Sequence, residues 1–208
     1  MANPIPENAV YIDPSNPTRY RYVGNTDWWE EMFPGWAPMN EHNLGLTGGS
    51  EKIKYHTSLG YLNQGGLFKA ANQKYKRYNA NMGLETKVTS WLDLNAKFRL
   101  NRKEDDKPAR SAAIEGIYGD RIATDLRPNI PIRHPDGHYS GQGNTTNPFA
   151  MNEYNGRETY QSDDVWLTGG FNLHPLKNFR VIGDMTWNSY NYNNKINIKS
   201  FDEYGAVR

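Results

Sequence analysis

Residues 26–66 read TDWWEEMFPGWAPMNEHNLGLTGGSEKIKYHTSLGYLNQGG and contain two runs in which apolar and polar residues alternate. The longer run, 53–61, has its larger apolar side chains at odd positions and polar or small ones at even positions. Gly48-Gly49-Ser50 separates the two runs and has the backbone freedom that a tight turn needs. A period of two predicts strands with one apolar and one polar face, so we expect an antiparallel hairpin here.

The same alternation recurs further along the chain, at 75–88, 91–101, 164–173 and 179–198. It is most regular in 91–101, where every second side chain is apolar and the others are charged or amide-bearing. The apolar set is Leu92, Leu94, Ala96, Phe98 and Leu100. Strand after strand of this kind, joined by short turns, predicts an all-β fold built as an antiparallel meander.

Two segments lack the alternation and are expected to be mostly loop. The first, 1–40, contains Pro4, Pro6, Pro14 and Pro17, and its only regular element is expected to be a short helix within 27–33, capped by Asn25 or Thr26. The second, 102–163, contains the charged run 103–107, a candidate helix within 109–124 and several turn signals. The remaining parts, 41–101 and 164–208, are then expected to hold four strands, and two strands with the start of a further loop.

Composition excludes several functional classes. The 208 residues have a formal net charge of +1 with dispersed Lys and Arg, which argues against nucleic acid as a partner. There is no cysteine, so thiolate metal sites and cysteine nucleophiles are absent. Aromatic residues make up 13% of a chain whose mean hydropathy is only -0.88. Transmembrane barrels combine these properties, because their strands are apolar at alternate positions only.

No catalytic constellation is visible, and we expect neither enzymatic activity nor a cofactor. His134 and His138 flank Pro135-Asp136-Gly137, which is typical of a turn. A metal site would need three or four converging ligands, so the turn is the favoured interpretation and no metal is expected.

Several short motifs then occur in one order with short spacings. They are TDWWEEMF (26–33), APM (37–39), HNL (42–44), TGGSEK (47–52), KY (54–55), LGYLNQGG (59–66), YKRYN (75–79) and VTSWL (88–92). Together they resemble the early barrel region of SusC/RagA-type TonB-dependent outer-membrane transporters, most specifically over 25–101. The family usually has Asp or Asn where this chain has Ser50 and Ser90, and Glu where it has Gly65.

The resemblance implies a segment of a transmembrane barrel of about 22 strands with a plugged lumen. It also implies uptake of glycans or peptides across the Gram-negative outer membrane, together with a SusD-like surface lipoprotein and driven through TonB. The plug and the TonB box of such transporters are not recognisable here, and residues 1–6 do not begin a signal peptide. We therefore expect the chain to be an internal part of a longer protein.

The barrel reading assigns the two faces of the strands. Leu92, Leu94, Phe98 and Leu100, with Ala96, are expected to face lipid, and Asn95, Lys97 and Arg99 to face the lumen. Aromatic residues near strand ends are typical of the membrane interface. Those expected there are Trp91, Trp166, Phe179 and Trp187.

Loop lengths predict the orientation. The short connections 48–52, 89–90 and 175–178 are expected to be periplasmic, and the long segments 1–40, 67–74 and 102–163 external. Substrate contacts are expected in the longest loop, because loops on a rigid scaffold commonly carry recognition. Its ring-bearing polar residues are Tyr118, His134, Tyr139 and Tyr154. Packing of the loop against itself is the alternative role for each.

A soluble, secreted β-sandwich that binds carbohydrate is the rival interpretation. It would explain the aromatic content and the polar loops, but it requires a second layer over the apolar faces. The dense aromatic group in 28–36 fits either view, as a sugar-stacking surface or as the core of a loop, and packing is favoured. Its members are Trp28, Trp29, Phe33 and Trp36.

Overall fold

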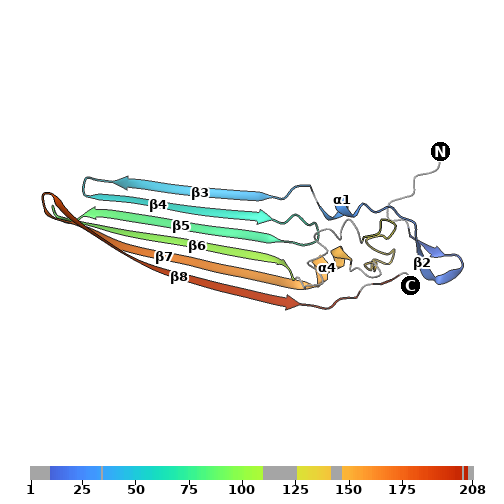
Figure 1. Cartoon of the computed structure of the whole chain (residues 1–208). Coiled ribbons are helices and arrows are strands. Elements are labelled where there is room, and N and C mark those ends of the chain that lie inside the picture. The colour runs from blue at the N-terminus through green and yellow to red at the C-terminus, as the bar shows by residue number, and fades with distance from the viewer. Residues whose placement is uncertain (1–9, 34, 110–125, 142–146, 203, 206–208) are drawn as a thin grey trace.

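The computed structural model describes residues 10–33, 35–109, 126–141, 147–202 and 204–205. Six long strands lie side by side, and two short helices and a small hairpin gather beyond one end of them (Figure 1). The elements are β1 (Val10–Asp13), β2 (Asn16–Tyr22), α1 (Trp28–Met32), β3 (Met39–Gly49), β4 (Ile53–Gly65), β5 (Lys74–Lys87), β6 (Leu92–Pro108), α4 (Pro148–Tyr154), β7 (Gly156–Leu176) and β8 (Phe179–Ile198).

The long strands form one sheet in the order β3-β4-β5-β6-β7-β8, and each pairs antiparallel with its neighbour in sequence. The register is unbroken from β3 to β7, and shifts once between β7 and β8, at Leu173–Leu176. The predicted all-β antiparallel meander is therefore confirmed. Among the described residues, no helix is long and apolar enough to cross a membrane.

The register places the apolar phases of all six strands on one face, which we call the apolar face. Leu100, for example, lies opposite Ala80 on β5 and opposite Val165 on β7. The larger members of this face are Leu44, Leu46, Ile53, Tyr55, Leu59, Met82, Leu84, Leu92, Leu94, Phe98, Leu100, Val165, Leu167, Phe171, Leu173, Val181, Met185 and Trp187. Alternation in the sequence has thus become a continuous apolar surface.

Nothing in the described part of the chain covers that surface. Leu44 is 68% exposed and Met185 is 79% exposed, values that a residue packed under a second layer would not show. The other described sheet is the two-stranded β1–β2 hairpin, which lies beyond the loop end of the strands (Figure 1). Among the described residues the structure therefore provides no second layer over the apolar face, which the β-sandwich alternative requires.

Along β6 the apolar band runs from Leu92 to Leu100 and then ends abruptly. At about 3.4 Å per residue this is about 27 Å, which matches the apolar band of a tilted membrane strand. The next row on the same face holds Tyr61, Tyr78, Arg102 and Asp163. Arg102 binds Asp163 through two hydrogen bonds of 2.5 and 3.1 Å, so this row is polar and aromatic.

Two rings of the expected aromatic belt lie elsewhere, and the interface position of Trp91 and Phe179 stays a prediction. Trp166 lies in the phase opposite to Leu167, on the polar face, and Trp187 lies within the apolar band opposite Leu167. The rings at the loop-side edge of the band are instead Tyr61 and Tyr78, whose centroids are 5.2 Å apart. Sequence alone could not distinguish a strand end from the end of its apolar band.

The strands near the long loop extend further than alternation predicted. β6 continues to Pro108 and β7 begins at Gly156, so the expected loop of 102–163 is shorter at both ends. The charged run 103–107 is paired strand rather than solvated loop. Lys107 lies opposite Glu158 and forms an ion pair with it at 3.8 Å, whereas Lys103 lies opposite Arg77. Beyond the apolar band a strand can be polar on both faces. The alternation of apolar and polar residues in the sequence then ends, although the strands remain paired.

The N-terminal segment also differs from expectation. The prolines do not prevent a hairpin, because Pro14 lies in the turn and Pro17 near the start of β2, where a missing N–H is tolerated. Helix α1 is confirmed, but its cap is Asp27, whose carboxylate accepts hydrogen bonds from the backbone N–H groups of Trp29 and Glu30 at 3.0 and 3.1 Å. The candidate helix at 109–124 lies, except for Ala109, outside the described residues.

Helix α4 was not predicted. Asn147 caps it by accepting a hydrogen bond from the backbone N–H of Phe149 at 3.0 Å, and Pro148 occupies its first turn. An Asn-Pro pair before an apolar residue is a recognised start signal for a helix, so the sequence carried the information.

The two faces of β6 should tolerate charge very differently in the whole membrane-inserted protein. Leu94→Arg would place a charge at mid-band on the apolar face and should cost roughly 2–4 kcal/mol. The matched variant Asn95→Arg lies on the polar face, near Asp184, and should be nearly neutral. Unfolding from lipid vesicles measures the difference, and equal costs for the two variants would contradict the assignment.

Candidate functional site

The face opposite the apolar face carries hydrogen-bonded polar side chains, and we call it the polar face. The amide of Asn81 donates to the hydroxyl of Ser58 at 3.2 Å. The hydroxyls of Thr168 and Thr186 are 2.9 Å apart. The amide of Asn188 donates to the carboxylate of Asp164 at 2.8 Å. Neighbouring strands are thus linked by polar contacts, as on a surface that meets water or a polar ligand.

A cation–π pair lies in the middle of this face, where Arg99 on β6 places its guanidinium carbon 5.0 Å from the ring centroid of Trp166 on β7. Close by, Gly170 leaves space between two side chains. A Cβ at Gly170 would lie 2.0 Å from a carboxylate oxygen of Asp184 and 2.5 Å from the amide nitrogen of Asn95. The missing side chain at this position therefore lets Asn95 and Asp184 approach each other across β7.

At the loop end, separate segments pack into one small apolar core, and we call this assembly the loop cap. It joins α1, residues 66–73, the described parts of 126–155, and 199–204. The buried core residues are Trp28, Met32, Leu126 and Met151, and Phe33, Phe68, Ile132, Phe149 and Phe201 pack against them. Most of the hydrophobic burial in the described chain is therefore in the loops rather than in the sheet.

Backbone contacts fix the loop cap around α1. The N–H of Thr26 donates to the carbonyl of Pro128 at 2.7 Å, and the hydroxyl of Thr26 donates to the carbonyl of Ile130 at 3.0 Å. The indole N–H of Trp28 donates to the carbonyl of Arg127 at 3.1 Å. Trp28 and Phe33 thus pack in a loop core, which was the favoured interpretation of this aromatic group. Trp29 is 63% and Trp36 70% exposed, so these two rings remain accessible.

Arg157 ties the loop cap to the sheet. Its guanidinium donates to a carboxylate oxygen of Asp106 on β6 at 2.9 Å, and to the carbonyls of Ala71 and Asn72 at 2.7 and 2.9 Å. One cation therefore joins β6, β7 and the β4–β5 loop.

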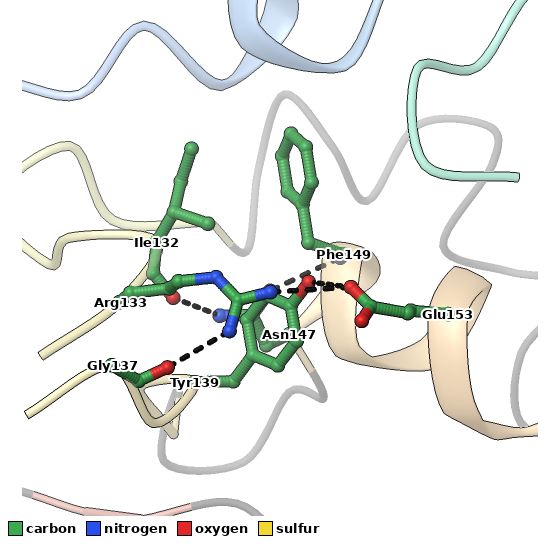
Figure 2. A network of polar contacts seen from close by, with 7 residues as sticks. All are labelled: Ile132, Arg133, Gly137, Tyr139, Asn147, Phe149 and Glu153. Atoms are coloured by element: carbon green, nitrogen blue, oxygen red, sulfur yellow. Dashed lines mark hydrogen bonds and ion pairs between the residues drawn. The ribbon is translucent and has the colours of Figure 1, made fainter.

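Tyr139 belongs to a polar network in the longest loop (Figure 2). Its hydroxyl donates to the carboxylate of Glu153 on α4, and the Arg133 guanidinium lies 3.6 Å from its ring centroid. Arg133 also pairs with Glu153 at 3.1 Å and donates to the carbonyl of Gly137 at 2.8 Å. Burial and the bond to Glu153 raise the pKa of Tyr139, so the phenol is neutral and acts as a donor.

His134 lies on the other side of that loop, among tyrosines from the N-terminal hairpin. Its Nε2 is 2.7 Å from the hydroxyl of Tyr22, and its ring centroid is 4.7 Å from that of Tyr20. Burial lowers the pKa of His134, although the nearby Asp136 carboxylate acts weakly in the other direction. Burial also raises the pKa of Tyr22, to about 12, so both partners are neutral at physiological pH.

The structure places the four expected substrate residues differently. Tyr139 and Tyr154 are in contact, with ring centroids 5.6 Å apart in an edge-to-face arrangement. Tyr154 is 42% exposed, whereas His134 and Tyr139 are buried by contacts within the chain. Tyr118 lies outside the described residues. Among the described residues no group of three or more His, Cys, Asp or Glu side chains is suited to a metal ion.

A group of rings on the polar face was missed by sequence reasoning. Tyr160 on β7 and Tyr190 and Tyr192 on β8 form what we call the tyrosine cluster. The Tyr160 and Tyr190 hydroxyls are 3.3 Å apart, and the Tyr160 and Tyr192 ring centroids are 5.0 Å apart. Tyr190 and Tyr192 are 59% and 57% exposed. Leu167 and Trp187 lie at odd positions on the apolar face, and all three tyrosines lie at even positions. The alternation alone would therefore have placed these rings on the polar face.

Known proteins are similar to this chain in sequence and in fold. No family model matches the chain. It is 33% identical over 157 residues to the TonB-dependent receptor P26 of Formosa agariphila, a match that covers 72% of this chain. It is 29% identical over 121 residues to the TonB-dependent receptor SusC of Bacteroides thetaiotaomicron, which covers 58% of this chain. A solved structure of the RagAB peptide importer in a closed-closed state superposes with a TM-score of 0.63, at 17% identity, over 82% of this chain.

The chain belongs to the SusC/RagA-type TonB-dependent receptors. It spans 14% and 11% of the length of the two curated relatives, and 20% of the structural match. Members of this family are transmembrane β-barrels, so the six-stranded sheet is part of the wall of a barrel. The resemblance seen in the motifs of residues 26–92 is confirmed.

The stability of the loop cap should depend on pH through the imidazole of His134. The unfolded loop would protonate its imidazole near pH 6.5, whereas burial keeps the folded imidazole neutral to lower pH. The folded loop should therefore lose stability as pH falls below about 6.5.

Hydrogen exchange tests this at the amide of His134, which donates to the carbonyl of His138, between about pH 7.5 and about pH 5.5. After correction for intrinsic rates, protection should fall at the lower pH. His134→Gln keeps a polar partner for Tyr22 without titrating and should lose most of that dependence. An unchanged dependence in the variant would show that another group is responsible.

Proposed function

We propose that this chain forms part of the barrel wall of an outer-membrane transporter that imports glycans or peptides. The observation that carries the proposal is that the two faces of the sheet differ in polarity along all six strands. Six consecutive strands keep an uncovered apolar face on one side and a hydrogen-bonded polar face on the other. The first face suits lipid and the second suits the lumen of a barrel. Family membership supports active import coupled to TonB rather than passive diffusion.

The lipoprotein partner belongs to the same proposal. The structural relative is described as a peptide importer, RagAB, and another relative as SusC. We infer that a SusD-like lipoprotein covers the loop end of the whole protein. Trp29 on α1 and Trp36, which follows α1, are exposed rings that such a partner could contact. Contact with TonB would involve parts of the longer protein, since no TonB box is recognisable in this chain.

The orientation follows from loop length. Connections at one end of the sheet consist of residues 50–52, 88–91 and 177–178, and the loop cap occupies the other end (Figure 1). Outer-membrane barrels keep short turns on the periplasmic side and long loops outside. The loop cap is therefore proposed to be external, and the polar face below it to line the path of the substrate.

Substrate contact is assigned to rings that stay accessible. The tyrosine cluster lies on the polar face in the loop-side part of β7 and β8, beyond the apolar band. Aromatic rings beside amides and carboxylates, such as Asn194 bound to Glu158 at 3.1 Å, can stack on a sugar and bind its hydroxyls. Tyr154, and Tyr118 outside the described residues, remain our loop candidates. His134 and Tyr139 would reach a ligand only if the loop cap opened.

The absence of enzymatic activity is retained as part of the proposal. The titratable groups with shifted pKa in the described loop cap, His134, Asp136 and Tyr139, are engaged by neighbours within the chain. Among the described residues, neither His134 nor Tyr139 lies beside an accessible nucleophile in an open cleft, as catalysis would need.

Impermeant thiol labelling on intact cells tests the orientation, because the chain has no native cysteine. Asp136→Cys lies in the loop cap and should react, whereas Lys177→Cys lies in the β7–β8 turn and should react only after the outer membrane is broken. Surface labelling of Lys177→Cys alone would invert the proposed topology.

Uptake by cells that carry the whole transporter tests the tyrosine cluster. Replacing Tyr160, Tyr190 and Tyr192 together by Ala should weaken the affinity for the oligosaccharide or peptide by roughly a hundredfold, at about 1 kcal/mol per ring. The matched triple replacement by Phe keeps the rings and should retain most of the affinity. Unchanged affinity in the Ala variant would remove the cluster from the substrate path.

A further inference from the structure

A groove on the apolar side of the sheet begins just beyond the apolar band. Two rows of side chains follow the row of Arg102 and Asp163 toward the loop cap. The nearer row is Lys76, Glu104, Gln161 and Asn193, and the farther row is Lys74, Asp106, Thr159 and Lys195. These residues, together with Asp105 and Tyr160 of the alternate strand phase, line a depression of about 350 Å³, and we call it the lysine groove.

The groove shares its face with the apolar band. Glu104 follows Leu100 and Arg102 at intervals of two residues on β6, and pairing carries the same phase onto β5, β7 and β8. Its side chains therefore point toward the membrane side of the wall and not into the lumen. They lie at the level where lipid headgroups begin, because the apolar band below them has ended.

Carboxylates also line the groove, and Glu104 and Asp106 lie opposite Lys76 and Lys74, but among the described residues its lysines form no ion pair. Arg102 binds Asp163, and Arg157, at the end of the groove, pairs with Asp106 at 2.8 Å. No described carboxylate forms an ion pair with Lys74, Lys76 or Lys195, even though Glu104 is the cross-strand neighbour of Lys76. The polar face provides a contrast at a similar height, since Lys107 there pairs with Asp105 and Glu158 at 3.7 and 3.8 Å.

The chemistry of the groove suits a phosphorylated sugar. Three ammonium groups can bind phosphate oxygens. The amides of Gln161 and Asn193 and the hydroxyl of Thr159 can bind sugar hydroxyls. A molecule that filled the groove and also had acyl chains would lay those chains on the apolar face directly below. Clusters of basic side chains beside a membrane span are a recognised mode of headgroup binding.

We propose that the lysine groove binds the phosphorylated glucosamine headgroup of lipopolysaccharide. The occupant follows from the proposed orientation, which places this end of the strands in the outer leaflet. The inference goes beyond the transport function, because it concerns the lipid that anchors and stabilises the wall rather than the substrate inside it.

The experiment uses the whole transporter purified in detergent and compares three lipids. These are lipid A with both phosphates, lipid A from which both phosphates have been removed, and phosphatidylglycerol. Binding is measured by native mass spectrometry and by the rise in melting temperature. The matched variants are Lys74→Gln/Lys76→Gln/Lys195→Gln in the groove and Lys54→Gln/Lys97→Gln/Lys103→Gln on the polar face. Each triple variant removes three positive charges from the same sheet.

The wild-type protein should bind phosphorylated lipid A more tightly than the dephosphorylated form. At roughly fivefold per lysine, the groove variant should lose affinity on the order of a hundredfold. The polar-face variant should bind like the wild type. Equal affinity of the groove variant and the wild type would overturn the proposal, as would equal affinity of both lipid A forms for the wild type.

Phosphatidylglycerol is the control that distinguishes a general phospholipid site from a lipopolysaccharide site. If it binds the groove as tightly as lipid A and loses this binding in the groove variant, the assignment to lipopolysaccharide is wrong. The comparison of lipids on the wild type needs no variant, so it decides the matter even if a triple variant folds poorly. Since binding is read without uptake, failure here would leave the proposed transport function standing, and failed uptake would leave this result unaffected.

Discussion

Backbone hydrogen bonding without water is the constraint on which the rest of this structure depends. In hydrocarbon each unsatisfied N–H or C=O costs several kcal/mol, so a spanning strand must pair along its whole membrane length. The register from β3 to β7 is unbroken, and the pairing of β7 with β8 shifts only next to the short turn at Leu176–Phe179. With the backbone satisfied in this way, the side chains are left to distinguish lipid from lumen.

Three zones follow along each long strand. In the first, from Leu92 to Leu100 on β6, one face is apolar and the other polar. In the second, the row of Tyr61, Tyr78, Arg102 and Asp163 marks the loop-side edge of the apolar band. In the third, both faces are polar, and the ion pairs of Lys107 and Arg157 connect neighbouring strands. The loop cap then supplies the only sizeable buried core among the described residues, and Arg157 connects it to the sheet.

The sequence could predict the first zone well, because alternation is strongest where one face meets lipid. The phase of Leu92, Leu94, Phe98 and Leu100 and the meander topology were both predicted correctly. Beyond Leu100 the signal weakens for a physical reason. Residues 103–107 are charged on both faces, and their strand character depends on partners that lie on β5 and β7.

The loop cap was the least predictable part, because its contacts join residues far apart in the chain. His134 packs against Tyr20 and Tyr22 of the N-terminal hairpin, and Thr26 binds the backbone of 128–130. No local pattern contains that information. The start of α4 at Asn147-Pro148, by contrast, was visible in the sequence, as was the phase of the tyrosine cluster.

The central claim is that one face of this sheet meets lipid and the other meets water. Spin labels at single cysteines from 92 to 108, in the whole protein reconstituted in lipid vesicles, test it most directly. Accessibility to oxygen should peak at even positions from 92 to 100, and accessibility to a nickel chelate at odd positions. Beyond 101 the chelate should reach both faces. Chelate access at the even positions of 92–100, or no period of two there, would contradict the account.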